Sequence, residues 1–384
     1  MQGKLERFSL SDGEDAVIHE LRAPLGAAAE ALKQFWAALD GEQGSDLHRR
    51  DIASRLASRE DIGDRWYVAT TIEGIVCALE LSRSNRIPHL GSVHHLYTTP
   101  SRREQGLARH VLEVALDRFA SDGGHAVIVQ LKRGTPAYNL FADFHSEDYL
   151  AMPAPSDRVT VRRVFGDSEA FEQRFFSAAT PEALARRPLR RSDKSALLHL
   201  FSHPVPYLIR YFALHVVGQY GFEDSVMMLL ETLERGQGTS VLGVAAEGTP
   251  AALGTVLPAD LPSPPLPYRE HVRLLDLFAR PGFEDALGPV LEALLVRADL
   301  LPGVRRLLSV VDEENSGVRA ALEDAGFVQA GTLHDYVMYG DRGGNAVFYE
   351  LTRSAPDTPA PPQHGNHAAQ PEGKAGGDSA GAAR

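Results

Sequence analysis

The sequence predicts an α/β protein with two similar halves, each a mixed, twisted β-sheet flanked by helices. Short segments rich in β-branched and aromatic residues alternate with longer segments whose apolar residues recur at helical spacing. The clearest case is Leu96–Arg109, where an apolar strand passes through Pro100 and a tight basic loop into a helix. A comparable series of elements returns about 180 residues later, so we expect an internal repeat.

Composition limits the classes of function. A chain of 384 residues is long enough for two domains, and 43% apolar and 23% charged residues are typical of a globular protein. The formal net charge of −12 argues against nucleic acid as a partner. Cys77 is the single cysteine, so no internal disulfide can form, and its apolar neighbours indicate a buried strand position. We expect a cytoplasmic protein without a membrane partner, since the charged start lacks an apolar signal core and no segment has the length of a membrane span.

The first half is read from its periodicity. Residues 1–60 are expected to be mostly helical, because Ala27, Leu32 and Trp36 share one helical face. The elements expected next are strands Trp66–Thr71, Ile75–Leu81 and Gly91–Thr98, a helix from Leu107 to Phe119, strand His125–Leu131, a short helix Pro136–Phe144 and strand Val159–Phe165. Residues 167–187 are charged and alanine-rich, which predicts a helical connector.

The second half repeats these elements. An offset of 181 positions carries Pro100 to Pro281, the long helix to Glu284–Ala298 and the following strand to Arg306–Val311. It also relates Ser11-Asp12 to Ser192-Asp193. The expected hairpin Ser240–Leu257 matches the first-half hairpin at an offset of 174, and the proline-rich loop Leu261–Tyr268 absorbs the difference of seven residues.

These matches predict four segments in the chain. They are a first domain at 1–166, a connector at 167–187, a second domain at 188–353 and a disordered tail at 354–384. The tail is rich in Pro, Gly, Ala and Ser and has almost no large apolar residues. It contains His364 and His367, but a solvated tail accounts for both, and we expect no metal site.

The loop before the long helix has the chemistry of a pyrophosphate cradle. A helix N-terminus presents unpaired amides and the positive end of the helix dipole. Gly106 and Ala108 would let a phosphate approach that backbone, and Arg103 adds a planar cation suited to phosphate oxygens. The alternative is an ordinary helix start, because Ser101 and Glu104 have the spacing of a capping box.

The pattern Arg-x-x-Gly-x-Ala at Arg103–Ala108, with a strand before it and a helix and strand after it, resembles the acetyl-CoA loop of the GNAT N-acetyltransferase superfamily. The resemblance implies two tandem GNAT-like domains, acetyl-CoA as co-substrate, and a small-molecule or peptide amine as acceptor, in a monomer or homodimer. The cofactor-binding residues that it implies are Leu96, Tyr97, Thr98, Arg103, Glu104, Gln105, Gly106, Leu107, Ala108 and Arg109.

The second half lacks this loop. At the same offset Arg103 becomes Glu284, which would repel phosphate, and Ala108 becomes Pro289, which has no amide proton. The second half keeps Asn315–Phe327, which closely resembles the family's Asn-to-Gly-Phe segment. We therefore expect the active centre in the first half and a degenerate second half that packs against it as a homodimer partner would.

The family often uses a tyrosine as general acid toward the departing thiolate. The corresponding positions here hold Phe141 in the first half and Leu322 in the second, so neither half has it. Tyr138 and Tyr149 are the nearby substitutes, although packing roles also explain both.

Acetyl transfer to an amine needs a base that removes the amine proton. His94 and His95 lie on the strand before the loop, and counting by two puts His94 on one face with Leu96. His94 is therefore the expected base, with Glu80 on the adjacent strand as the other catalytic candidate. The alternative for the histidines is that both are ordinary half-buried strand residues. The alternative for Glu80 is an ion pair with Arg83 or Arg86.

Two other functions fit the same sequence. One is a non-catalytic acyl-CoA-binding or regulatory protein, which the missing tyrosine favours. The other is a tandem acetyltransferase of the mycothiol-synthase kind, in which the second half is usually the active one.

Overall fold

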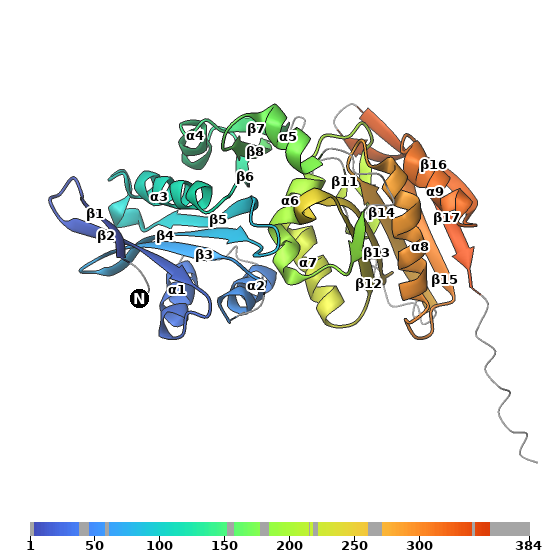
Figure 1. Ribbon diagram of the computed structural model, residues 1–384, viewed down its shortest axis with the longest axis horizontal. Coiled ribbons are helices and arrows are strands. Elements are labelled where there is room, and N and C mark those ends of the chain that lie inside the picture. The colour runs from blue at the N-terminus through green and yellow to red at the C-terminus, as the bar shows by residue number, and fades with distance from the viewer. Residues whose placement is uncertain are drawn as a thin grey trace, which may run out of the picture. The chain divides into compact units, whose positions relative to one another are not determined.

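The computed structural model describes residues 4–37, 46–57, 61–151, 157–176, 184–214, 216–217, 222–259, 271–339 and 342–353 (Figure 1). The predicted loop Leu261–Tyr268 and the predicted tail 354–384 lie outside these residues. The helices are α1 (Ala27–Ala37), α2 (Asp46–Ala57), α3 (Leu107–Ser121), α4 (Pro136–Ala142), α5 (Ser168–Phe176), α6 (Lys194–Phe201), α7 (Phe222–Glu234), α8 (Leu287–Ala298) and α9 (Ser316–Asp324).

The first sheet has the strand order β1-β2-β3-β4-β5-β6-β8-β7. Its strands are β1 (Lys4–Ser9), β2 (Asp15–Arg22), β3 (Arg65–Thr71), β4 (Gly74–Arg83), β5 (Leu90–Thr98), β6 (Ala126–Lys132), β7 (Glu147–Ala151) and β8 (Arg158–Val164). The pair β5–β6 is parallel and the other neighbours are antiparallel.

The second sheet has the order β16-β17-β15-β14-β13-β12-β9. Its strands are β9 (Ala185–Arg187), β12 (Thr239–Val244), β13 (Pro250–Pro258), β14 (Val272–Ala279), β15 (Arg306–Asp312), β16 (Val328–Tyr339) and β17 (Arg342–Thr352). A separate short ladder joins β10 (Ile209–Tyr211) to β11 (Val216–Val217).

The two sheets have the same architecture. When the first sheet is followed from β2 and the second from β9, the strands are connected in the same order. The single parallel pair is β5–β6 in the first sheet and β14–β15 in the second. The protein is thus a mixed α/β chain with two separate mixed sheets, which fits a tandem arrangement of two domains. β1 is an addition before the repeated unit of the first half.

The strands and helices expected between residues 66 and 165 are present with bounds shifted by a few residues. Residues 1–60, however, are not mostly helical, because β1 and β2 precede α1. The stretch Asp15–Arg22 buries Ala16, Ile18 and Glu20, which is the period of a strand. The end of the expected helical connector is also wrong, since Ala185–Arg187 is strand β9.

The match of Ser11-Asp12 to Ser192-Asp193 is wrong as well. The first pair lies in the turn of the β1–β2 hairpin, whereas the second belongs to a 3-10 turn that leads into α6. Because β1 is the extra strand, a constant offset does not hold across the beginning of the two halves.

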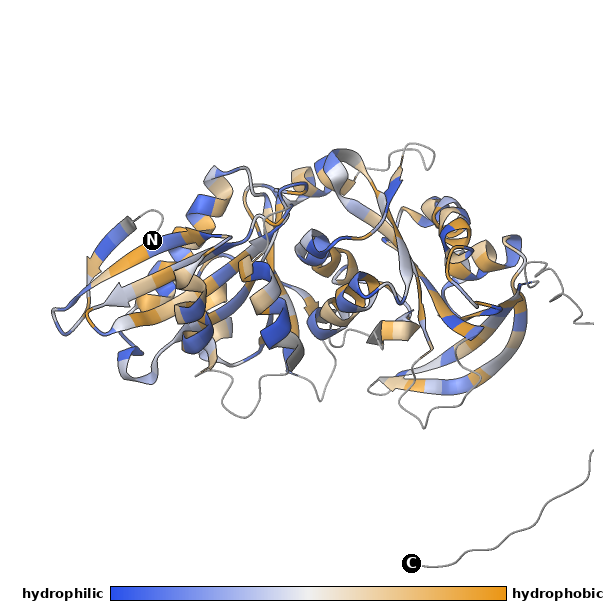
Figure 2. Cartoon of the chain, turned by 90° about the horizontal axis from the view of Figure 1, so that it is seen from below, coloured by the Kyte–Doolittle hydropathy of each residue, from blue (hydrophilic) through white to orange (hydrophobic). Residues whose placement is uncertain are grey.

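Both faces of the first sheet are covered. The consecutive β3 residues Trp66 and Tyr67 are fully buried and point to opposite faces. Trp66 packs with α1 and α2, and Tyr67 packs with α3. In Figure 2 hydrophobic residues run along the strands of both sheets.

Helices α6 and α7 connect the two sheets (Figure 1). Their buried residues, among them Leu197, Leu198 and Phe201, form one apolar core with Ile128 of the first sheet and Phe278 of the second. Burying each such side chain stabilises the fold by roughly 1.5–3 kcal/mol. Residues 1–353 therefore form one compact unit.

Two buried histidines make hydrogen bonds between the halves. Nε2 of His199 in α6 donates to the carbonyl oxygen of Gly91 in β5 at 2.9 Å. Nε2 of His89 lies 2.8 Å from Oγ1 of Thr249. Burial lowers the pKa of His199 to about 3 and that of His89 to about 4, so both rings are neutral near pH 7.

Acid should therefore weaken the folded state. In the unfolded chain a histidine recovers a pKa near ~6.5, so between about pH 6.5 and pH 3 the unfolded state binds more protons than the folded state. The stability that these rings provide is complete above that window and is lost as the pH falls through it. The amide of His199→Gln can still donate to Gly91. Between pH 7 and pH 5 we expect the free energy of unfolding to fall by about 2 kcal/mol less in this variant than in the parent.

Thermal or urea unfolding at the two pH values measures this difference. His334→Gln, at an exposed position of β16, is the control and should keep the acid sensitivity of the parent. Equal acid sensitivity in His199→Gln and the parent would show that His199 is not the group responsible.

Candidate functional site

The site is built on the loop between β5 and α3. After Thr98 the chain makes a 3-10 turn over Pro100–Arg102, and α3 then begins at Leu107. Glu104 and Gly106 have φ angles of 64° and 81°, a region that suits glycine, and the N-cap residue Gly106 offers no side-chain cap. The capping-box alternative for Ser101 and Glu104 is therefore wrong, because both residues lie before the helix.

The loop leaves backbone donors at the start of α3. The amide of His110 is bonded to the carbonyl of Gly106 at 3.1 Å, as in a regular first turn. By geometry the amides of the three residues before His110 have no helical carbonyl to bond. They lie at the positive end of the helix dipole, which favours an anion.

These residues border an open pocket of about 530 Å³. Its lining comes from the end of β5, the loop, the first turn of α3 and the first turns of α4, and comprises Leu96, Tyr97, Thr98, Arg102, Arg103, Glu104, Gly106, Leu107, Ala108, Arg109, Pro136, Ala137 and Leu140. Nine of the ten residues that the sequence suggested for cofactor binding are in this lining, and Gln105 is not. The Oε1 atom of Gln105 is buried and has no hydrogen-bond partner among the described residues.

The two arginines of the loop have different surroundings. Arg103 is exposed, donates from Nε to the carbonyl of Thr98 at 3.3 Å, and lies 5.7 Å above the ring of Tyr97. Arg102 is buried and forms ion pairs with the carboxylates of Asp12, Glu14 and Glu73. Arg102 thus fastens the loop to the neighbouring hairpins, a role that sequence analysis did not find because its partners are distant in the chain.

A β-bulge interrupts β5 beside the pocket. Ala78 pairs with Tyr97 and Glu80 with His94, so β5 has one more residue than β4 in this interval. His95 lies in the bulge with a φ of 53°. The expectation that His94 and Leu96 share a face is therefore wrong, because the extra residue reverses the alternation.

The two residues do lie on opposite faces. Leu96 packs against the core under α3, whereas His94 lies with Glu80 on the face covered by α2 and α6. His94 is buried, and both ring nitrogens have partners, since Nδ1 is 2.8 Å from Oε1 of Glu223 and Nε2 is 2.7 Å from Oγ of Ser92.

Glu80 is also buried. Its partner is Arg55 of α2, with Nε at 3.2 Å from Oε1, and not Arg83 or Arg86, the partners expected from the sequence. Its second oxygen is 3.7 Å from Nε2 of His95. Arg55 also pairs with Asp64, whose pKa burial raises to about 6.

His95 directly precedes Leu96, the first β5 residue of the pocket lining. Its side chain is 18% exposed, against 5% for that of His94, and its ring lies 5.5 Å from the ring of Trp36 in α1. The indole Nε1 of Trp36 donates to the carbonyl of His95 at 3.2 Å, which holds the bulge against α1.

The second half differs from the first along the strand that leads to the loop. The pairing of β13 with β14 is regular from Ala252 to Pro258, without a bulge. Beyond the short parallel pairing of β14 and β15, β10 and the following 3-10 turn contact both strands. Asp276 accepts the amides of Phe212 and Ala213 at 3.0 and 2.7 Å, and Asp312 accepts those of Leu208 and Ile209 at 2.7 and 2.9 Å. This segment of the chain fills the space between β14 and β15 beyond their short parallel pairing.

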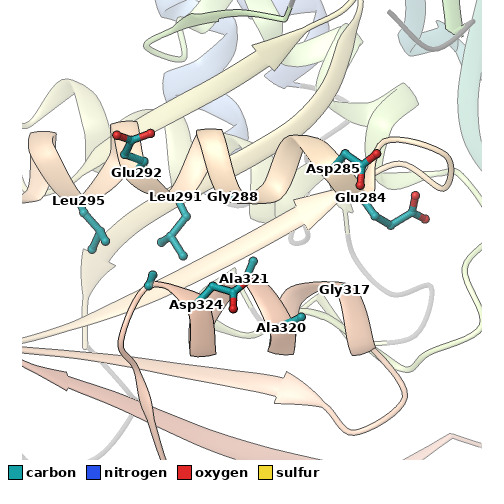
Figure 3. A pocket seen from close by; sticks show the side chains of 11 residues that line it. Glu284, Asp285, Gly288, Leu291, Glu292, Leu295, Gly317, Ala320, Ala321 and Asp324 are labelled. Atoms are coloured by element: carbon teal, nitrogen blue, oxygen red, sulfur yellow. The ribbon is translucent and has the colours of Figure 1, made fainter. Parts of the chain in front are cut away.

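A groove of about 580 Å³ does lie between α8 and α9 of the second half (Figure 3). Its walls carry four carboxylates, Glu284, Asp285, Glu292 and Asp324, on a floor of small and apolar residues. Like charges repel, so this groove disfavours a phosphate-bearing ligand.

The tyrosines proposed as substitutes for a general acid lie elsewhere. The hydroxyl of Tyr138 donates to Asp148 at 3.1 Å, and that of Tyr149 is 2.7 Å from Nδ1 of His203. Phe141 and Leu322 are buried, as core residues would be. Tyr97 is the tyrosine that lines the pocket.

Asn315 has the role that its motif indicates. It caps α9 by accepting the amide of Val318 at 3.2 Å. Cys77 is free and buried, and burial raises the pKa of its thiol to about 12.

Comparison with solved structures finds GNAT N-acetyltransferases. An N-acetyltransferase from Staphylococcus aureus is 18% identical, with 44% of this chain and 98% of that chain covered and a TM-score of 0.36. A ribosomal-protein-alanine N-acetyltransferase from Brucella melitensis is 18% identical, with 44% and 100% covered and a TM-score of 0.36. The putative acetyltransferase yncA from Salmonella typhimurium, determined with its cofactor acetyl-CoA, is 12% identical, with 46% and 99% covered and a TM-score of 0.37.

No protein-family model and no curated protein matches the chain. Within the described ranges, no helix is both long and apolar enough to cross a membrane. The same residues include no group of three or more His, Cys, Asp or Glu side chains placed to hold a metal ion.

Proposed function

We propose that the first half binds acetyl-CoA in the pocket between β5, α3 and α4 and transfers the acetyl group to a primary amine. The observation that carries this proposal is the convergence of the residues of the acetyl-CoA-like loop on one open pocket beside a bulged strand. The filled and acidic counterparts in the second half support a single cofactor site per chain.

The pyrophosphate would lie at the N-terminus of α3. There the backbone amides of the first turn donate to its oxygens, and Gly106 leaves room for its approach because it has no side chain. Arg103, exposed at the edge of the pocket, supplies a cation. Gln105, whose buried Oε1 atom has no hydrogen-bond partner among the described residues, does not line the pocket.

The thioester would lie along the end of β5, where backbone amides of Leu96–Thr98 can hydrogen-bond its carbonyl oxygen. The neutral amine attacks the carbonyl carbon, a C–N bond forms, the C–S bond breaks, and CoA leaves as a thiolate. The amine nitrogen gives up one proton, which the protein must accept and finally pass to solvent.

We assign that proton transfer to His95 in place of the expected His94, with Glu80 as its partner. His95 directly precedes Leu96 of the pocket lining, and its side chain is 18% exposed, against 5% for that of His94. The carboxylate of Glu80, 3.7 Å from Nε2, would stabilise the imidazolium that forms.

The first test concerns the cofactor. Calorimetric titration with acetyl-CoA should give one site per chain. Gly106→Val should raise the dissociation constant by at least ~10-fold, since a side chain at a φ of 81° strains the backbone and occupies the phosphate approach.

Gly288→Val in α8 is the matched control, because a Cβ atom at this position of the second half would meet nothing within 4 Å. It should leave the affinity unchanged. Two equal sites, or tight binding that persists in Gly106→Val, would contradict the assignment.

The second test concerns the base. His95→Ala should lower turnover by roughly 10²- to 10⁴-fold, the range for loss of general-base catalysis, with little change in acetyl-CoA affinity. Glu80→Gln should have a smaller effect in the same direction because it acts on His95. Release of free thiol from acetyl-CoA over a panel of amines measures turnover.

His94→Ala decides between the two histidines. If it abolishes turnover while His95→Ala keeps it, His94 is the base, as the strand alternation alone would have it, and the assignment to His95 is wrong.

A non-catalytic acyl-CoA-binding protein is the second candidate, favoured by the absence of a tyrosine at the position of Phe141. It predicts acetyl-CoA binding without thiol release for any amine. An active second half, as in the mycothiol-synthase kind, fits less well with the segment that Asp276 and Asp312 bind between β14 and β15.

We further propose a small-molecule or peptide amine as the acceptor. We also propose a reducing, cytoplasmic location, which the free Cys77 supports.

A further inference from the structure

Residues of the second half reach the strand that carries the two histidines. Glu223, in the first turn of α7, places Oε1 at 2.8 Å from Nδ1 of His94. Lys194, at the start of α6, lies 3.2 Å from the same oxygen and 2.9 Å from Asp51 of α2. Ser195 places its hydroxyl 2.9 Å from that of Ser92.

These contacts determine how the ring of His94 is held. Burial opposes the charge on Glu223, but His94 and Lys194 hold its pKa well below the usual range, so it is ionised. At 2.8 Å from an ionised carboxylate, Nδ1 of His94 is favourably placed only when it carries a proton, because its lone pair would otherwise face a negative charge. In the neutral ring Nε2 then accepts from the hydroxyl of Ser92.

His94 is also the residue that precedes the bulge. Its ring centroid is 6.1 Å from that of His95, and both histidines lie near Glu80. His95 follows directly in the bulge, so an ordered ring of His94 limits the positions that the ring of His95 can take.

We propose that Glu223 is a positioning residue for the reaction of the first half, holding His94 in one tautomer and orientation and thereby fixing His95 beside the cofactor pocket. This proposal rests on the proposed acetyl transfer. It makes the second half a contributor to the acceptor side of the first-half site.

The ionic surroundings define what Glu223 would change. The charged and titratable groups around the histidine pair are Glu223 of α7, Lys194 of α6, Asp51 and Arg55 of α2, and Glu80 of β4. Glu223 interacts electrostatically with both histidines. Loss of its charge removes a stabiliser of the imidazolium form of His95, so the rate of acetyl transfer should persist to lower pH.

The test compares Glu223→Gln with Glu231→Gln. Glu231 is on the same helix and also makes an ion pair to the first half, with Arg50 at 2.8 Å, so both variants remove one contact between the halves. Glu223→Gln should lower kcat/KM for the amine by ~10- to 100-fold and shift the acid limb of the pH–rate profile to lower pH. The acetyl-CoA dissociation constant should stay within about two-fold, because the pyrophosphate site is at the far end of β5.

Nuclear magnetic resonance of the histidine ring nitrogens gives a readout that does not depend on turnover. In the full-length parent and in Glu231→Gln the ring of His94 should be in the Nδ1–H tautomer. In Glu223→Gln that preference should be lost, because an amide can donate as well as accept.

The outcomes separate the two proposals. If no amine releases thiol but the tautomer changes in Glu223→Gln alone, acetyl transfer is wrong and the positioning of His94 stands. If Glu223→Gln keeps the parent tautomer, or matches Glu231→Gln in its pH profile, the positioning role is overturned.

Discussion

The extra residue of β5 at His95 is the constraint on which the site depends. It reverses the alternation of side chains along the strand, so His94 and Tyr97 share one face and Leu96 takes the other. It lies at the point where β5 leaves β6, since these parallel strands pair only over Leu90–Ser92. The end of β5 beyond that point, Leu96–Thr98, lines the pocket. In the second half the strand is regular, and the space between β14 and β15 is filled by the chain itself.

The buried charges between the halves form the second constraint. Arg55 and Lys194 are fully buried, and carboxylates on both sides of the contact neutralise them. Removing one partner of such a pair leaves an uncompensated charge, which commonly costs about 3–5 kcal/mol. The halves therefore cannot separate without exposing this cluster to water, and the ionic contacts specify one way of docking on the apolar core of α6 and α7.

The second half differs from the first in its loop and in the segment that lies across its strands. Its loop has Glu284 in place of the arginine and Pro289 in place of the alanine of the first, and Asp276 and Asp312 bind a segment that lies between β14 and β15. Burial raises the pKa of Asp276 to about 7, so the carboxylate that holds the segment is kept at a cost of desolvation. In return, the two aspartates accept hydrogen bonds from four backbone amides of the segment.

The sequence by itself determined the local features of this protein. The loop from Arg103 to Ala108, the helix after it and most strands of the repeat follow from patterns within about 15 residues. The divergence of Glu284 and Pro289 was also legible in the sequence. Only the tertiary structure decided which side of β5 each histidine occupies. A single extra residue reverses the face of every residue after it, and nothing in the residue pattern of the strand marks its position. It also decided that Glu80 pairs with Arg55 and His94 with Glu223, since these partners are separated by 25 and 129 positions and no local period links them.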